Sequence, residues 1–259
     1  MSAMKVAAVD GTALLRWVEL DLPEPPWDEH EPFVGFVYLD AQAGLSAKGG
    51  RKGDPDHVER PGLTVRLPIG VPGRVLPADE ARARGLPERP GWLVHYGAQP
   101  PADAPWRTDP ALRGRFHRSF PDDLQVLIHD GEPRRTGTQT ELCWLRVVAA
   151  DDAAGRTVYV GQLLSKPHQL ATVAQGDRLR FLPAPGGRYP LYVTAAYLAE
   201  RACWKIEPCS GCGLTETLDP PSVMARTRFP DVAAGSEPVM FTAHCAACQG
   251  TQVVTKVQP

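Results

Sequence analysis

The 259-residue sequence predicts a β-rich α+β fold built from antiparallel sheets. About a dozen short runs have the alternating or β-branched pattern of strands, whereas only two segments have a helical pattern. The dipeptides Asp10-Gly11 and Asp130-Gly131 are typical of tight turns between antiparallel strands. The 27 prolines and 24 glycines further indicate short strands joined by many loops.

The first expected region, residues 1–138, contains six of these strands and one helix. We expect Asp10-Gly11 to join residues 4–9 and 13–20 in a hairpin. Residues 77–85 predict a helix, because acidic residues open it, arginines follow and Gly85 can end it. Residues 41–62 are polar and glycine-rich, which favours a surface loop over a phosphate-binding loop. The other strands expected here are residues 33–39, 63–67, 92–96 and 124–128.

The second expected region, residues 139–203, is predicted to be a small β-barrel-like module. Residues 141–149 and 157–164 form two strong strand patterns, and residues 178–182 form a third. A short helix over 194–203 follows, with Thr194 as its N-cap.

The third expected region, residues 204–259, holds the clearest chemical motif. It contains two Cys-x-x-Cys pairs, formed by Cys209, Cys212, Cys245 and Cys248. Such pairs supply the four thiolates of a tetrahedral Zn²⁺ site, since two intervening residues let one turn aim both sulfur atoms at one point. Other interpretations are two disulfides, four reduced thiols or redox pairs, and His244 is a further candidate to replace one ligand.

The residues around these pairs predict hairpins with the cysteines at their tips. Strands are expected over 204–207, 214–218, 239–242 and 251–255, and Gly213 and Gly250 suit a backbone that turns with positive φ. This arrangement resembles a zinc ribbon over roughly residues 203–257. The 32 residues between Cys212 and Cys245 exceed the roughly 15–20 of the common pattern, and we expect residues 219–238 to be loop-like.

Residues 141–204 resemble a bacterial family listed as domain of unknown function 2314. The likeness rests on Leu142-Cys-Trp144-Leu-Arg-Val, on Val160-Gly161-Gln-Leu163 leading to Lys166-Pro167, and on Gly176-Asp177-Arg-Leu-Arg-Phe181. The resemblance implies a small β-rich module and, for some relatives, a role as immunity or interaction proteins. It implies no catalytic residue.

Composition limits the class of function. The formal net charge is −2, and the segment from residue 200 onward contains six acidic and five basic residues. A ribbon that binds nucleic acid normally has a basic face, so nucleic acid is the less favoured partner. We find neither a secretory signal nor an apolar run of about 20 residues, and cysteines in metal-binding spacing suit a reducing compartment. These features favour a cytoplasmic protein, and the arginine-rich composition is typical of bacteria with GC-rich genomes.

These sequence features lead to three hypotheses for the function. The first is a non-enzymatic binding or adaptor protein with a structural four-cysteine zinc site and a protein partner, including an immunity protein that neutralises a toxin. The second is a nucleic-acid-binding zinc ribbon. The third is a hydrolase that uses the region of His117, Asp122, His129 and Asp130, although Pro121-Asp122-Asp123 is also ordinary turn chemistry. We assign no catalytic or cofactor-binding residue.

Overall fold

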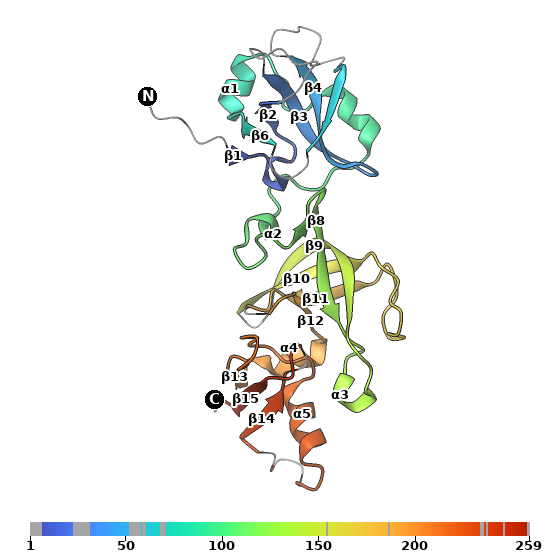
Figure 1. Cartoon of the computed structure of the whole chain (residues 1–259), viewed down its shortest axis with the longest axis vertical. Helices are drawn as coiled ribbons and strands as arrows, with labels where there is room; N and C mark the ends of the chain where they lie inside the picture. The colour runs from blue at the N-terminus through green and yellow to red at the C-terminus, as the bar shows by residue number, and fades with distance from the viewer. Residues whose placement is uncertain are drawn as a thin grey trace, which may run out of the picture. The chain divides into compact units, whose positions relative to one another are not determined.

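The computed structural model of the chain describes residues 7–22, 32–51, 58, 61–67, 71–153, 155–185, 187–233, 236, 238–245 and 247–257. The chain forms two compact units. The first comprises Met1–Thr108 and Phe116–Pro121, and the second comprises Asp109–Arg115 and Asp122–Pro259. Figure 1 shows that three sheets dominate the fold, and almost every pair of neighbouring strands in them is antiparallel. The β-rich α+β class with antiparallel sheets is therefore confirmed.

The first unit contains a six-stranded antiparallel sheet whose strand β3 is buried on both faces. Along β3, Phe33 and Val37 join one hydrophobic cluster, whereas Phe36 and Tyr38 join another with Trp92. The strands follow the order β1 (Ala7–Ala8), β6 (Pro72–Val75), β2 (Trp17–Leu20), β3 (Phe33–Asp40), β4 (Gly44–Arg51) and β5 (Leu63–Arg66). The helices of this unit are η1 (Gly11–Ala13), α1 (Ala78–Ala83), η2 (Gly91–Tyr96) and α2 (Pro105–Thr108).

The second unit contains a sheet whose strand pairings form a ring. Its order is β12 (Leu191–Tyr192), β11 (Arg178–Leu182), β10 (Arg156–Leu163), β9 (Glu141–Ala153) and β8 (Phe120–Ile128), and the short strand β7 (Phe116–His117) pairs with β8 as the sixth strand. The ring closes because β12 also pairs with β8 in parallel, with Leu191 opposite Leu127. The connection between β8 and β9 carries the short helix α3 (Pro133–Thr136).

The third sheet follows the ring in the same unit, and the four clustered cysteines lie in turns next to its strands. It has the order β13 (Trp204–Ile206), β15 (Thr251–Lys256) and β14 (Met240–His244), all antiparallel. Helix α4 (Ala195–Arg201) leads into β13, and helix α5 (Pro221–Arg228) lies beside β14 (Figure 1). Met224 and Ala225 of α5 pack with Phe241 and Val254 in the core of this part.

Several local predictions are confirmed, among them the two helices. Helix α1 starts one residue after Pro77, and the side chain of Thr194 caps α4 by accepting a hydrogen bond from the Tyr197 N–H (3.1 Å). Strands β10 and β11 nearly coincide with the strands predicted over 157–164 and 178–182, and β9 extends the one predicted over 141–149.

Other local predictions are wrong, each for a physical reason. Asp10-Gly11 does not form a hairpin turn, because the Asp10 carboxylate accepts from the Thr12 N–H (2.9 Å) and caps η1, while β1 pairs with β6. Residues 92–96 belong to the 3₁₀ helix η2, in which the neighbouring Trp92 and Leu93 are both buried instead of alternating. The glycine-rich residues 44–51 form strand β4, since glycines allow a close approach to β3. The segment 219–238, expected to be loop-like, contains α5, and no strand forms over 214–218.

The pairing of Gly35 with Gly49 gives a test of this close approach between β3 and β4. A Cβ atom at position 49 would lie 2.0 Å from the carbonyl oxygen of Val34 and 2.6 Å from the Cα of Gly35. We therefore expect Gly49→Ala to lower the free energy of unfolding by about 1–3 kcal/mol. Gly62→Ala is the control, because nothing lies within 4 Å of its Cβ position. Urea denaturation of both variants checks this, and equal stabilities would contradict it.

Candidate metal centre

The four predicted cysteines come together in one cluster at the tips of two turns. Their sulfur atoms all lie within 4.8 Å of one another. The sulfurs of Cys209 and Cys248 are 3.4 Å apart, and those of Cys212 and Cys245 are 3.7 Å apart. A metal ion with four sulfur ligands at about 2.3 Å in a tetrahedron would hold its ligands about 3.8 Å apart. The spacing of the four sulfur atoms is therefore close to that of a metal site, and the cluster could hold one metal ion.

The first turn follows β13 and is shaped by its own backbone. The Cys209 N–H donates to the Leu214 carbonyl (3.0 Å), and the Gly213 N–H donates to the Cys209 carbonyl (2.9 Å). Gly213 has φ 76°, as predicted for a turn that reverses beneath a metal. The Gly211 N–H points at the sulfur of Cys209 (3.4 Å), so the turn supplies the sulfur with a hydrogen-bond donor.

The second turn joins β14 to β15 and differs from the prediction at one glycine. The Cys245 N–H donates to the Gly250 carbonyl (2.6 Å), and the Gln249 N–H donates to the Cys245 carbonyl (2.8 Å). The residue with positive φ is Gln249 (φ 64°), not Gly250. Gly250 is needed for space, because a Cβ atom there would lie 2.7 Å from the sulfur of Cys209 and 2.8 Å from the Gly211 nitrogen.

The two turns are also joined directly. The Ser210 N–H donates to the Thr251 carbonyl (3.0 Å), and the Thr251 N–H donates to the Ser210 hydroxyl (3.0 Å). Gly211 completes the contact, since a Cβ atom at this position would lie 2.9 Å from the sulfur of Cys248. The approach of the two Cys-x-x-Cys turns is thus defined by backbone contacts as well as by the sulfur atoms.

The electrostatics of the cluster favour one thiolate and oppose another. Burial disfavours a charge on Cys209, yet the N–H groups of Cys212 and Gly211 and the neighbouring thiols lower its pKa to about 6. Burial dominates at Cys245 and raises its pKa to about 12. A cation bound among the sulfur atoms would supply the positive charge that the buried thiols need in order to ionise.

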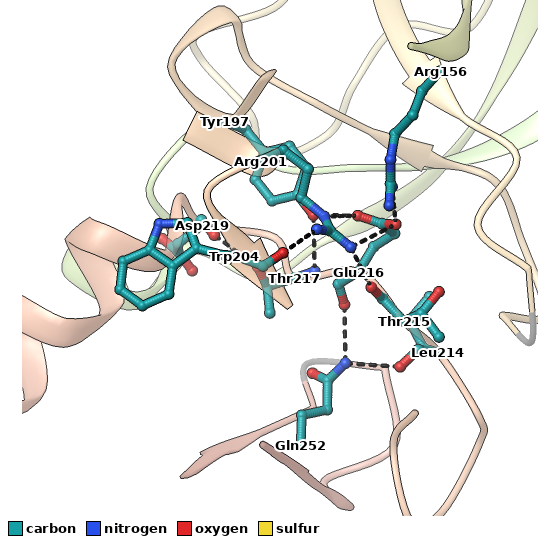
Figure 2. A network of polar contacts seen from close by, with 10 residues as sticks. All are labelled: Arg156, Tyr197, Arg201, Trp204, Leu214, Thr215, Glu216, Thr217, Asp219 and Gln252. Atoms are coloured by element: carbon teal, nitrogen blue, oxygen red, sulfur yellow. Dashed lines mark hydrogen bonds and ion pairs between the residues drawn. The ribbon is translucent and has the colours of Figure 1, made fainter. Parts of the chain in front are cut away.

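Residues 214–219, which follow the first turn, are held by a buried polar network (Figure 2). Glu216 is 3% exposed and accepts from Arg201 Nε (2.7 Å), from Arg156 (2.7 Å) and from the Tyr197 hydroxyl. Arg201 is 6% exposed and also donates to the carbonyls of Trp204 (2.6 Å) and Thr215 (3.2 Å). Both ion pairs therefore attach the segment between the cysteine pairs to α4 and β10.

The same segment is attached to the third sheet through Gln252. Its side-chain amide donates to the carbonyls of Leu214 (2.8 Å) and Glu216 (3.1 Å), as Figure 2 shows. Gln252 is 1% exposed and lies on β15, which starts just after the second turn. Burial and the adjacent Glu216 carboxylate raise the pKa of Tyr197 far above its usual value, so its hydroxyl stays a donor to Glu216.

A second polar feature lies beside Cys245 and has no counterpart in the sequence analysis. Asp219 is 1% exposed, and burial raises the pKa of its carboxyl group to about 6 although Arg134 lies nearby. The Arg134 N–H donates to Asp219 (3.4 Å), and its side-chain Nε lies 3.8 Å from the carboxylate. These residues line a pocket of about 410 Å³ with His244, Cys245 and Gln249. Arg134 and Asp219 are 85 positions apart in the sequence, which explains why no sequence motif indicates this pocket.

The structure gives His129 and Asp130 structural partners. The His129 ring is fully buried, its Nε2 donates to the Tyr192 carbonyl (2.9 Å), and its Nδ1 accepts from the Gly131 N–H (3.1 Å). Burial lowers the pKa of His129, so the ring is neutral at pH 7. Asp130 accepts from the Glu132 N–H (3.2 Å).

His117 and Asp122 lie in different units. His117 accepts from the Ser119 N–H (3.2 Å) and packs against Phe120, whereas Asp122 is buried in β8. Among the described residues, the four cysteines are the one group of three or more Cys, His, Asp or Glu side chains arranged to hold a metal ion. His244 lies outside this group, and its carbonyl accepts from Arg134 (2.5 Å).

Comparison of the chain with protein-family models, with curated proteins and with solved structures found no match. In the part of the chain that the structure describes, no helix is long and apolar enough to cross a membrane.

The buried network predicts unequal effects for two ion pairs near the cysteines. Arg201→Met leaves the Glu216 carboxylate without its main partner, so we expect the free energy of unfolding to fall by about 3–5 kcal/mol. Lys205→Met is the matched control, because the Lys205–Glu207 pair is exposed (67% and 43%) and contributes about 0–1 kcal/mol. Chemical denaturation measures both changes.

A double variant tests the cause of the Arg201 effect. If the incompletely compensated charge of Glu216 is responsible, Arg201→Met with Glu216→Gln is more stable than Arg201→Met alone. Equal small losses in the Arg201 and Lys205 variants would show that the network is not a major contributor to stability.

Proposed function

We propose that the chain is a non-enzymatic protein-binding or adaptor protein whose C-terminal part is a zinc ribbon held by a structural Zn²⁺ ion. The observation that carries this proposal is the ligand set of Cys209, Cys212, Cys245 and Cys248. Four thiolates occupy all four positions around a tetrahedral zinc ion and leave none for a reactive water molecule. A site of this kind contributes to folding rather than to chemistry.

The choice of zinc is supported by the ligand chemistry and by the surrounding fold. Thiolates are soft ligands that favour zinc over the hard cations Mg²⁺ and Ca²⁺. The two turns lie at the ends of strands in a small antiparallel sheet, which is the arrangement of a zinc ribbon. Zinc–thiolate ligation requires reduced cysteines, which supports a cytoplasmic location.

A role in binding a protein is supported by the way the remaining polar groups are used. The side chains of His129 and Asp130, which are candidates for a hydrolase, are engaged in bonds that shape turns. The likeness of residues 141–204 to domain of unknown function 2314, together with the ring of strand pairings in that region, suggests a barrel-like interaction module. Neutralisation of a toxin as an immunity protein is one form that this function can take.

The zinc site predicts a specific effect of removing one ligand. We expect Cys248→Ser to lose the bound zinc and to lower the melting temperature by more than about 5 °C, because metal binding contributes several kcal/mol to folding. Cys203→Ser is the matched control, since Cys203 is also exposed and lies outside the cluster. Native mass spectrometry counts the metal, and calorimetry measures the melting temperature. An unchanged melting temperature in Cys248→Ser and after chelation would contradict a structural zinc ion.

The binding function predicts a stoichiometric protein partner. The tagged full-length chain, purified gently from its native lysate after nuclease treatment, should retain one protein in a fixed ratio. The complex should survive moderate salt, whereas nucleic-acid binding would weaken steeply as salt rises. Retention on heparin or DNA at low salt without a protein partner would favour the nucleic-acid alternative. A clear substrate turnover without a partner would overturn the proposal.

A further inference from the structure

Strand β14 is an edge of the third sheet, because β15 lies between it and β13. Its side chains alternate strictly between the two faces. Phe241 and Ala243 are buried, whereas Met240, Thr242 and His244 are exposed. The strand is therefore firmly packed on one face and open along one side.

The pairing register shows which backbone groups point away from the sheet. The Lys256 N–H donates to the Val239 carbonyl (2.6 Å), and the Cys245 N–H donates to the Gly250 carbonyl (2.6 Å). In an antiparallel pair, alternate residues bond to the neighbouring strand, so residues 239, 241, 243 and 245 face β15. The N–H and C=O groups of Met240, Thr242 and His244 consequently face away from it.

A hydrogen bond from Arg134 agrees with the outward direction of these backbone groups. The Arg134 guanidinium donates to the His244 carbonyl (2.5 Å), which is one of the outward groups. No hydrogen bond from another described residue reaches the outward groups of Met240 or Thr242. The opposite edge differs, since the outward carbonyl of Trp204 on β13 is bonded to the buried Arg201 (2.6 Å).

A groove runs beside this open edge. It has a volume of about 240 Å³ and lies between β14 and α5. Met224 and Phe241 give it apolar walls, and Arg134 and Arg228 are its charged residues. No described residue lining the groove is acidic. The buried Asp219 carboxylate lies 3.8 Å from Arg134 Nε, but Arg134 and Arg228 together still give the groove a positive charge, which complements an anionic group. At the start of β14, Val239 and Met240 are 62% and 61% exposed and extend the apolar surface.

We propose that the edge of β14 binds an extended segment of a protein partner, which adds a strand to the third sheet and places an acidic side chain near Arg134 and Arg228. The outward N–H and C=O groups of Met240 and Thr242 would pair with the segment, and an apolar side chain would enter the groove beside Met224. This assignment rests on the proposed protein-binding function and names the surface and the chemistry of the partner.

A second copy of the chain is a poorer occupant of this surface. Pairing of two β14 edges would bring Arg134 and Arg228 of one copy close to the same residues of the other, and like charges in an interface oppose association. A segment with one Asp or Glu among β-branched residues has both the complementary charge and the preference for an extended conformation.

The metal centre helps to preform this edge. Cys245 directly follows His244, so the ion that binds Cys245 also fixes the end of β14. A preformed edge lowers the entropy lost on binding. Removal of the metal by a chelator should therefore weaken binding of the segment even though no segment atom contacts the metal.

The test uses a phage-displayed library of random linear octapeptides selected on the immobilised zinc-loaded full chain. We expect enrichment of peptides with one acidic residue flanked by Val, Ile or Thr. Thr242→Pro removes the central outward N–H, and proline is tolerated at such an edge position. It should weaken the enriched peptides at least about tenfold, a loss comparable to one or two strand hydrogen bonds. Thr242→Val keeps the N–H and should bind normally.

Three further measurements make the test independent of how the proline variant folds. Arg134→Gln should reduce the preference for acidic over lysine-substituted versions of the same peptide. N-methylation of alternate amides in an enriched peptide should abolish binding, because the peptide then lacks its strand donors. Hydrogen exchange should show new protection of the Met240 and Thr242 amides.

These outcomes distinguish a failure of strand addition at β14 from a failure of the proposed protein-binding function. Failure to enrich any peptide, equal binding to zinc-loaded Thr242→Pro, or tolerance of N-methylation would overturn strand addition at β14. If the partner captured from the native lysate still binds Thr242→Pro, the protein-binding function holds and the surface lies elsewhere. If no partner is captured but peptides bind as expected, the edge is confirmed and the function in the cell must be reconsidered.

Discussion

The ion pair between Arg201 and Glu216 is the interaction on which the C-terminal arrangement depends. Both side chains are almost fully buried, and their separation of 2.7 Å lets each compensate for the water that the other has lost. A buried charge without a partner is strongly destabilising, so neither residue can move without the other. Arg201 ends α4, and Arg156 on β10 also pairs with Glu216. The two ion pairs of Glu216 therefore link the segment after the first cysteine turn to α4 and to the ring of strand pairings.

The cysteine cluster and the buried network together position the two cysteine turns and the segment that follows the first of them. The thiolates and the metal that they can hold bring the two turns to one point, and the glycines at 211 and 250 let the turns touch. The network then holds the segment after the first turn against α4 and β15 through Glu216 and Gln252. Among the residues that the structure describes, the hydrophobic core of this part has seven buried members, including Trp204 and Phe241, and the cysteine cluster and the polar attachment add to it.

The sequence predicts the fold class and the ligand set because both depend on local patterns. Strand periodicity and cysteine spacing are visible within a few residues, and the four sulfurs do meet. Features that depend on distant residues cannot be predicted in this way. Glu216 and Arg201 carry no motif, and Arg134 meets the His244 carbonyl across 110 residues. Local patterns also mislead where glycine has a packing role, as in β4, whose composition is that of a loop although it pairs closely with β3.

The long insert between Cys212 and Cys245 therefore has a structural role. A longer loop adds little closure entropy, so the metal site tolerates the extra residues at small cost. Those residues supply Glu216 for the buried network and Met224 for the core beside β14, and α5 forms one wall of the groove. The four cysteines bring the two turns together. The insert attaches this part of the chain to the rest of the unit and shapes the surface beside the open edge of β14. Differences in function among proteins with the same cysteine pairs are then expected to arise in the insert, since the ligands themselves leave little room for change.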